Sequence, residues 1–413
     1  MPSVEKRRPG IRGFHFTFPR PAAINNRDRG GRIPQSAMKK IIFLSILVIV
    51  GVLFAGQIRR GLLSLLILID STRPPEKAVM GRFVSPPIVK TISVPSRGKT
   101  LRADLYTPRT RGPHMPLLLV HGVNPTGKDD VQLALLARDF AMAGFLVLVP
   151  DLEGMKDLRV RPSDAEDIVQ GFLFVSRLKN ARSGGGMMGI SYGVGPMLLA
   201  AADSRVRDRV GLVASLGGYG DLRAVLLFLL TGSYDYGGQE GYLRPDESLR
   251  WAFLYKNLDL IHDAADRETL RELIEKRNRY ETGAAGALAK KLGPEGKAVY
   301  AFLANNDPKR FVMLYENLPL SFRAYMVQLS PVRALKQIKA YFIIVHGMED
   351  YSIPYTESMK LADAVGDRRR VRLALLPRFT HTELARTGRS AYETVVSGVR
   401  LFGAIYDMLR KAG

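Results

Sequence analysis

The sequence of 413 residues contains no cysteine. This absence excludes disulfide bonds, zinc sites built from thiolates and a cysteine nucleophile. It leaves the compartment open, because many exported proteins also lack disulfides. Motifs typical of nucleic-acid binding are missing as well, such as a basic helix ahead of heptads or an aromatic ribonucleoprotein box. We therefore expect no nucleic-acid partner, although the net charge is +22.

The amino-acid composition is that of an ordinary globular protein. Hydrophobic residues make up 46% of the chain and charged residues 24%, which excludes a disordered or collagen-like chain. Single hydrophobic cores stop growing at roughly 250–300 residues. A chain of this length therefore predicts one catalytic-size domain with an appendage or an insertion.

The first 40 residues form a basic tail, with ten Lys or Arg against two acidic residues. An uncharged apolar run, IIFLSILVIVGVLFAGQI, follows at 41–58, and a shorter one, LLSLLILI, lies at 62–69. The first run approaches the roughly 20 residues that cross a bilayer core. The sequence therefore predicts a membrane anchor at 41–69 that contains a transmembrane helix. A cleaved signal peptide is the alternative, although this basic leader is longer than an ordinary n-region.

The distribution of basic residues also predicts an orientation. Lys and Arg are more numerous in the tail than in the stretch just beyond the apolar run, which favours a cytoplasmic N-terminus. The large domain would then lie on the outer or periplasmic side of the membrane. Repeated prolines in STRPPEKAVMGRFVSPP, at 71–87, disfavour helix, and we interpret 70–89 as a Pro-rich linker.

From residue 90 onward the sequence alternates strands and helices. KTISVPSRGKTLRADLYTP predicts a β-hairpin around its SRGK turn. Segments with helical spacing include 129–144 and 163–178, the second beginning with Ser163 and Glu166 at the spacing of a capping box. Continuous apolar runs, typical of parallel strands buried on both faces, lie at 115–122, 144–151, 185–191, 209–218, 340–347 and 371–377. The pattern predicts an α/β fold with a mainly parallel sheet.

The interval 221–332 breaks this alternation. It is rich in Leu, Tyr and charged residues at helical spacing, so we expect a helical lid inserted between core halves at 90–220 and 333–413. Its apolar run AVLLFLL, at 224–230, fits either an acyl pocket or the core of the insertion.

The stretch GISYG places Ser191 between Gly189 and Gly193, after a predicted strand and before a predicted helix. A nucleophilic serine on a strained strand-to-helix turn needs these glycines, because side chains there would collide. This context predicts that Ser191 is a nucleophile. The overlapping GGGMMG has the spacing of a dinucleotide fingerprint, but it does not follow a strand, which argues against that site.

A serine nucleophile needs a base and an orienting acid. Of the six histidines, His381 in PRFTHTEL follows the last predicted strand, and we expect it to be the general base. Asp350 in VHGMEDYSIP follows the predicted strand 340–347 and is the expected acid, with the adjacent Glu349 as the alternative. The chain order of serine, acid and histidine is that of the α/β-hydrolase triad.

An acyl-transfer site also needs backbone N–H groups that stabilise the oxyanion. We expect the N–H groups of Tyr192, next to the serine, and of Val123, in LLLVHGVNPTG, to be the donors. Asn124 is a second candidate. His121 and Gly122 would shape this loop without reacting, since glycine lets the backbone approach the substrate.

Taken in order, HGVNPTG, VPDLEG, GISYGVG, HGMEDYSIP and FTHTEL resemble motifs of the α/β-hydrolase family, near its esterase and prolyl-oligopeptidase-like branches. The resemblance covers about 90–410 and leaves 1–89 uncovered. It implies a central sheet of about eight strands with helices on both faces. It further implies a nucleophile at Ser191, an acid at Asp350, a base at His381, and neither a metal nor an organic cofactor.

These patterns predict a membrane-anchored serine hydrolase that cleaves an ester-type bond through an acyl-enzyme. The expected substrate is a small-molecule or lipid-like ester. A peptidase or an acyltransferase of the same fold is the alternative enzyme, and a non-catalytic protein that retains the fold is the alternative from another class. The sequence leaves the oligomeric state open.

Overall fold

The computed structural model describes residues 35–377, 379–380 and 390–412. Contacts within the chain divide it into two compact units, Met1–Gly56 and Gln57–Gly413. The helix α1, Gln35–Ser71, contributes to both units, and every strand described belongs to the second. The second unit therefore contains the whole sheet.

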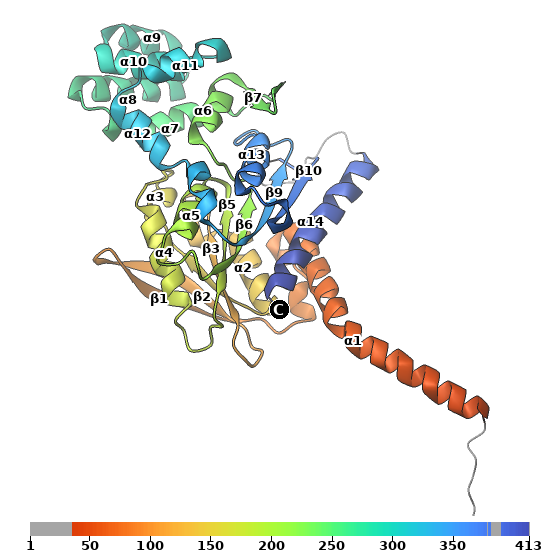
Figure 1. Ribbon diagram of the computed structural model, residues 1–413. Helices are drawn as coiled ribbons and strands as arrows, with labels where there is room; N and C mark the ends of the chain where they lie inside the picture. The colour runs from red at the N-terminus through yellow and green to blue at the C-terminus, as the bar shows by residue number, and fades with distance from the viewer. Residues whose placement is uncertain (1–34, 378, 381–389, 413) are drawn as a thin grey trace, which may run out of the picture. The chain divides into compact units, whose positions relative to one another are not determined.

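A mainly parallel sheet of eight strands forms the centre of the second unit (Figure 1). Its order is β1-β2-β4-β3-β5-β6-β9-β10; β2 is antiparallel to both of its neighbours, and the remaining neighbours are parallel. The strands are β1 (Ile88–Ser96), β2 (Lys99–Thr107), β3 (Met115–Val120), β4 (Phe145–Pro150), β5 (Gly185–Ile190), β6 (Val210–Leu216), β9 (Tyr341–Gly347) and β10 (Val371–Leu376). The predicted α/β sheet is confirmed, and the arrangement fits the α/β-hydrolase fold.

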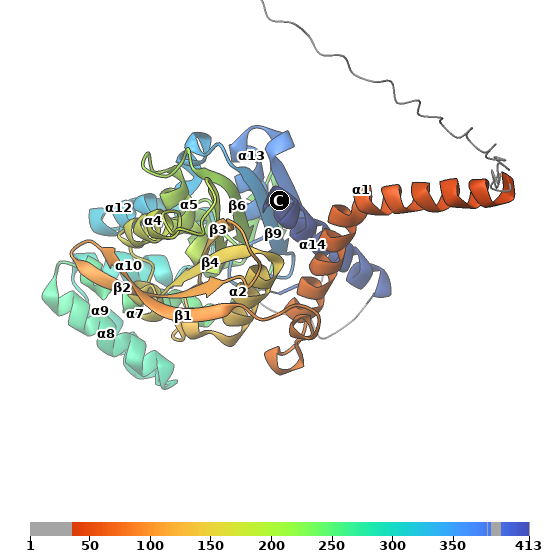
Figure 2. The same cartoon turned by 90° about the horizontal axis from the view of Figure 1, so that it is seen from below.

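The central strands bury both of their faces, because side chains alternate from one face to the other. Along β3, Leu117 and Leu119 pack in one apolar cluster, while Leu118 and Val120 pack in another. The first cluster includes α2 (Val131–Ala143), α14 (Ala391–Ala412) and the end of α1 (Figure 2). The second includes α4 (Asp164–Val175), α5 (Val194–Ala202) and α13 (Thr356–Val365).

The helix α4 begins at Asp164, but without the predicted capping box. The Ser163 side chain makes no capping hydrogen bond, because its own backbone is already helical, at φ −69° and ψ −16°, whereas a capping residue needs a non-helical backbone. The Asp164 carboxylate instead accepts the N–H of Arg161 at 2.7 Å. Glu166 pairs with Arg205 rather than reaching back to the helix start.

The interval 221–332 is mainly helical, but it also contains a hairpin, β7 (Ser233–Tyr236) with β8 (Gln239–Tyr242). Leu226, Phe228 and Leu229, from the apolar run in this interval, are buried in the core of the insertion. The helices are α6 (Leu222–Thr231), α7 (Glu247–Lys256), α8 (Ala264–Asn278), α9 (Thr282–Lys291), α10 (Pro294–Leu303), α11 (Pro308–Glu316) and α12 (Leu320–Gln328) (Figure 1).

The two connections of the insertion to the sheet, 220–222 and 330–332, are tied together, and we call them the neck. Glu357, fully buried on α13, accepts the N–H groups of Gly220 and the following residue at 3.0 and 2.9 Å. The N–H of Val332 donates to the carbonyl of Gly220 at 3.1 Å. The insertion is therefore closed at its base.

Within the part of the chain that the structure describes, no helix is long and apolar enough to cross a membrane. The run 41–58 falls within α1, and the side chains of 41–53 lie outside the described residues. Farther along α1, Leu63 and Ile67 are buried in the cluster that includes α2 and α14. The second apolar piece, at 62–69, therefore packs on the domain with part of its surface.

The segment 70–89, expected as a linker, is packed near its middle. The Asp70 carboxylate accepts the N–H groups of Val79 at 2.7 Å and of Met80 at 2.9 Å. Met80 is fully buried in the cluster that includes α2. These contacts hold the end of α1 and the start of the sheet domain in one arrangement.

Asp139 on α2 is a buried carboxylate, and burial raises its pKa to about 7, with a further increase from the charge of Asp70. Because this pKa lies above the ordinary value of 3.8, the stability that the group contributes below about pH 4 is lost as the pH rises through 7. We expect Asp139→Asn to raise the free energy of unfolding by about 2 kcal/mol at pH 8 and hardly at all at pH 4. Urea unfolding at both pH values measures this, and an equal gain at both would contradict it.

Candidate functional site

Ser191 lies on a sharp turn between β5 and α5. It directly follows the strand and has φ +53°, in the left-handed region that residues other than glycine rarely adopt. Its side chain is largely buried, with 8% of the residue exposed. Such strain is typical of functional sites, and a strand, a strained serine and a helix in this order make up the nucleophile turn of α/β-hydrolases.

The glycines around Ser191 leave room for close packing of three backbone segments. A Cβ atom on Gly193 would lie 2.2 Å from the carbonyl oxygen of His121. On Gly189 it would lie 3.0 Å from Cα of Val194, and on Gly122 it would lie 3.1 Å from Cβ of Ser191. The predicted supporting residues are therefore in contact, and they bring the loop after β3 against the serine.

Gly193→Ala is expected to damage the site, because the new methyl group would displace the backbone of the loop that holds Val123. Overpacking of this kind costs about 1–3 kcal/mol, and a shift of about 1 Å in the site can reduce the rate on the order of 100-fold. Thermal unfolding and the rate of labelling by a fluorophosphonate measure the two effects. Gly211→Ala on β6 is the matched control, since its Cβ would meet nothing closer than 3.9 Å; equal behaviour of the two variants would contradict the prediction.

Asp350 follows β9 by three residues and is buried, with 1% of the residue exposed. Its Oδ1 accepts the N–H groups of Ser352 at 2.8 Å and Ile353 at 3.0 Å. A Cβ on Gly217, the residue after β6, would lie 3.7 Å from Oδ2 of Asp350. Because the end of β6 pairs with the end of β5, the acid and the serine lie at the same edge of the sheet, on either side of β6.

Tyr192 connects the serine turn to the acid turn. Its hydroxyl donates to the carbonyl oxygen of Ser352 at 3.3 Å. Burial raises the pKa of Tyr192, and the negative charge of Asp350 raises it further, so the phenol stays neutral and remains a donor. The residue beside the nucleophile thus holds the turn that carries the acid.

His381 lies outside the described residues, so its role as the base stays a prediction. The two residues before it are described, and both contact the end of β9. The N–H of Glu349 donates to the carbonyl of Phe379 at 3.1 Å. A Cβ on Gly347 would lie 2.2 Å from the Phe379 carbonyl oxygen and 2.7 Å from that of Thr380. Phe379 and Thr380 therefore lie directly beside the turn that carries Asp350.

His121 supports the loop after β3. It is buried, its Nδ1 donates to the carbonyl of Gly122 at 2.7 Å, and its Nε2 accepts the N–H of Leu152 at 3.0 Å. Burial lowers its pKa, so the ring is neutral at pH 7. These bonds occupy both ring nitrogens, which fits the predicted shaping role.

The hydrogen bonds of this loop distinguish between the two candidate oxyanion donors. The N–H of Asn124 already donates to the carbonyl of Met155 at 3.2 Å. The N–H of Val123, in contrast, has no acceptor within the described part of the chain. Tyr192 lies in the short 3₁₀ turn Ser191–Gly193 that leads into α5, and N–H groups at the start of a helix have no acceptor within it. Val123 and Tyr192 therefore offer the better pair.

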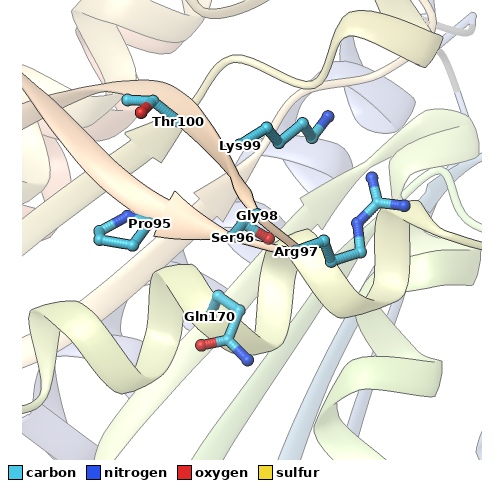
Figure 3. A pocket seen from close by; sticks show the side chains of 7 residues that line it. All are labelled: Pro95, Ser96, Arg97, Gly98, Lys99, Thr100 and Gln170. Atoms are coloured by element: carbon cyan, nitrogen blue, oxygen red, sulfur yellow. The ribbon is translucent and has the colours of Figure 1, made fainter.

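Other polar groups in the described ranges point to no further chemistry. No group of three or more His, Asp or Glu side chains among these residues could hold a metal ion. Asp151, at the end of β4, pairs with Lys156 at 3.0 Å and so stabilises its own loop. A surface hollow of about 480 Å³ lies at the β1–β2 turn (Figure 3). Its Arg97 is paired with Asp167 at 2.8 Å, so this basic group stabilises the turn.

Comparison with known proteins gives matches at the level of structure alone; no protein-family model and no curated protein sequence matches the chain. The acylaminoacyl peptidase of Pyrococcus horikoshii is 16% identical over 80% of this chain and 42% of that chain, with a TM-score of 0.46. The 2,6-dihydroxy-pseudo-oxynicotine hydrolase is 17% identical over 78% of this chain and 68% of that chain, with a TM-score of 0.44. Est1E from Butyrivibrio proteoclasticus is 13% identical over 78% of this chain and 98% of that chain, with a TM-score of 0.42. The chain thus spans about two fifths of the length of the acylaminoacyl peptidase.

Proposed function

We propose that this chain is a serine hydrolase that cleaves an ester-type bond through an acyl-enzyme. The observation that carries the proposal is the backbone of Ser191, held at φ +53° between β5 and α5. A buried carboxylate at the same sheet edge, Asp350, and the donor pair of Val123 and Tyr192 support it. A serine in this setting needs only a base, and His381 is the residue that the sequence offers.

In the proposed reaction, His381 takes the proton of Ser191 as Oγ attacks the carbonyl carbon of the ester. The carbonyl oxygen becomes an oxyanion that accepts hydrogen bonds from the N–H groups of Val123 and Tyr192. His381 then gives its proton to the leaving alcohol, and the acyl group stays on Ser191. A water molecule, deprotonated by the same histidine, then attacks the acyl carbon; the bond to Oγ breaks, the histidine returns the proton to Oγ of Ser191, and the acid leaves. Asp350 orients the imidazole and stabilises its positive charge.

The proposed substrate is a small-molecule or lipid-like ester with an apolar acyl group. The side chains of Val123 and Tyr192 pack against the apolar core of the insertion, which also includes Val160, Tyr219 and Ile353. A group bound beside the oxyanion donors would therefore meet apolar side chains. This environment favours a substrate with an apolar acyl group over one with a charged acyl group, because an unpaired charge is costly to bury.

The experiment that tests this function is labelling of the purified full-length protein with a fluorophosphonate, which reacts with activated serines. Stoichiometric labelling is expected, and it would justify a screen of chromogenic esters, thioesters and amides. Preferential cleavage of amides would favour a peptidase, and transfer to an added alcohol would favour an acyltransferase. A folded protein that stays unlabelled would contradict the proposal and favour a non-catalytic role.

Attachment to a membrane through the N-terminal helix, with the sheet domain on the outer or periplasmic side, is a separate part of the proposal. The basic tail and the apolar run 41–58 support it. So does an exposed apolar stripe farther along α1, formed by Ile58, Leu62 and Leu65. Carbonate extraction of membranes and a reporter fused after residue 413 test it. Release by carbonate would contradict the anchor, and a cytoplasmic reporter signal would contradict the orientation.

A further inference from the structure

A second buried histidine lies beside the proposed acid. His346 belongs to β9, and its side chain is as fully buried as that of Asp350. Its Nε2 lies 3.3 Å from Oδ2 of Asp350 and 3.1 Å from the carbonyl oxygen of Ile353. Its Nδ1 lies 2.6 Å from Oγ of Ser358 on α13. The ring therefore contacts the acid, the turn after the acid and the helix that follows.

These contacts place a proton on Nε2 of the His346 ring. A carbonyl oxygen accepts hydrogen bonds and cannot donate them, and the same is true of an ionised carboxylate. Nε2 therefore carries a proton that it donates to the carbonyl of Ile353, and Oδ2 of Asp350 lies 3.3 Å from the same nitrogen. Nδ1 and the hydroxyl of Ser358 share a second hydrogen bond. Turning the ring would leave buried polar atoms without partners, which costs more than a hydrogen bond gains on average.

The two oxygens of Asp350 are thus held from different sides. Oδ1 accepts two N–H groups of its own turn, and Oδ2 faces Nε2 of His346. We propose that His346 is a positioning residue that fixes the Asp350 carboxylate in the orientation that the general base needs. The inference rests on the proposed function, because it concerns the acid of that same site.

The test is the second-order rate constant for fluorophosphonate labelling of the full chain, with kcat and KM for any ester that the screen identifies. His346→Leu, which keeps the size but removes the donor, is expected to label about 100-fold more slowly, with lower kcat and unchanged KM. His346→Gln, whose amide N–H can replace the Nε2 donor, is expected to stay within about fivefold of the wild type. In an Asp350→Asn background, His346→Leu should add little, because its effect passes through the acid.

His114 provides the matched control. It is also buried, with Nδ1 3.2 Å from the carbonyl oxygen of Gly144 and Nε2 3.1 Å from that of Thr110, but it precedes β3 at the other edge of the sheet. His114→Leu should lower the melting temperature and leave the labelling rate of the folded protein unchanged. An equal loss of labelling in the two leucine variants would overturn the proposal.

The remaining outcomes are also decisive. If His346→Leu is labelled at the wild-type rate while Ser191→Ala is not labelled at all, this inference alone would be overturned. An unlabelled wild type, or labelling that survives Ser191→Ala, would overturn the proposed function and this inference with it. If the leucine variant fails to fold, His346→Asn replaces it, because its shorter side chain does not bring a donor to the Nε2 position. Equal labelling of the Gln and Asn variants would then overturn the proposal.

Discussion

Ser191→Ala is expected to abolish fluorophosphonate labelling and to reduce ester turnover by about 10⁶-fold, the scale seen when a serine nucleophile is removed. The physical reason is direct, since no other atom at the strained turn can form the acyl bond. The fold should survive, because alanine differs only by the lost hydroxyl, and the cost of the positive φ is unchanged. Intact-mass spectrometry after labelling measures the adduct, and thermal unfolding measures the stability.

Ser215→Ala is the matched control for this variant. Ser215 is also a buried serine, on the neighbouring strand β6, and its Oγ has no hydrogen-bond partner among the described residues. Removing this hydroxyl should leave labelling at the wild-type rate. Labelling that persists in Ser191→Ala, or disappears in Ser215→Ala, would show that the reactive serine lies elsewhere.

Asp350→Asn has the second largest expected effect, a decrease in kcat of about 10⁴-fold, as when the acid of a serine triad loses its charge. The Asn oxygen can still accept the N–H groups of Ser352 and Ile353, so the turn should keep its shape. Its NH₂ group, however, would face Nε2–H of His346, which is also a donor. The amide also carries no charge that could stabilise the imidazolium of His381. Steady-state kinetics and the labelling rate measure the effect, and the melting temperature shows whether the fold is retained.

Glu349→Gln is the control that decides between the two adjacent acids. It changes the charge by the same amount, one residue earlier in the chain. Activity within about fivefold of the wild type is expected, because the carboxylate that the N–H groups of Ser352 and Ile353 hold in this turn is that of Asp350. A large loss in Glu349→Gln with a small one in Asp350→Asn would reverse the assignment of the acid.

The sheet was predictable from the sequence because each central strand is buried on both faces. The runs at 115–122 and 144–151 contain too few polar residues for a one-sided strand, and both became parallel strands. The motif at Ser191 was also predictable, since its glycines reflect atoms that nearly touch, such as the position of Cβ on Gly193 and the His121 carbonyl. In both cases, the spacing of residues close together in the sequence is enough to predict the structure.

Features that depend on distant partners could not be predicted in this way. Ser163 and Glu166 have the spacing of a capping box, but Glu166 pairs with Arg205, far along the chain. The Pro-rich segment has the composition of a linker, but the Asp70 carboxylate binds its N–H groups and Met80 fills the core. His346 ends a strand like His121, and only its contacts with Asp350 and Ser358 distinguish their roles.

The closed neck of the insertion has an evolutionary consequence. Its two ends meet at Gly220 and Val332, and Glu357 holds one of them to α13. The insertion therefore leaves the sheet domain and returns to it at adjacent points, and its apolar core also packs against Val123 and Tyr192. Since the entropic cost of closing a loop grows only with the logarithm of its length, chain can be gained or lost in the insertion away from these contacts while the sheet and Ser191 stay as they are.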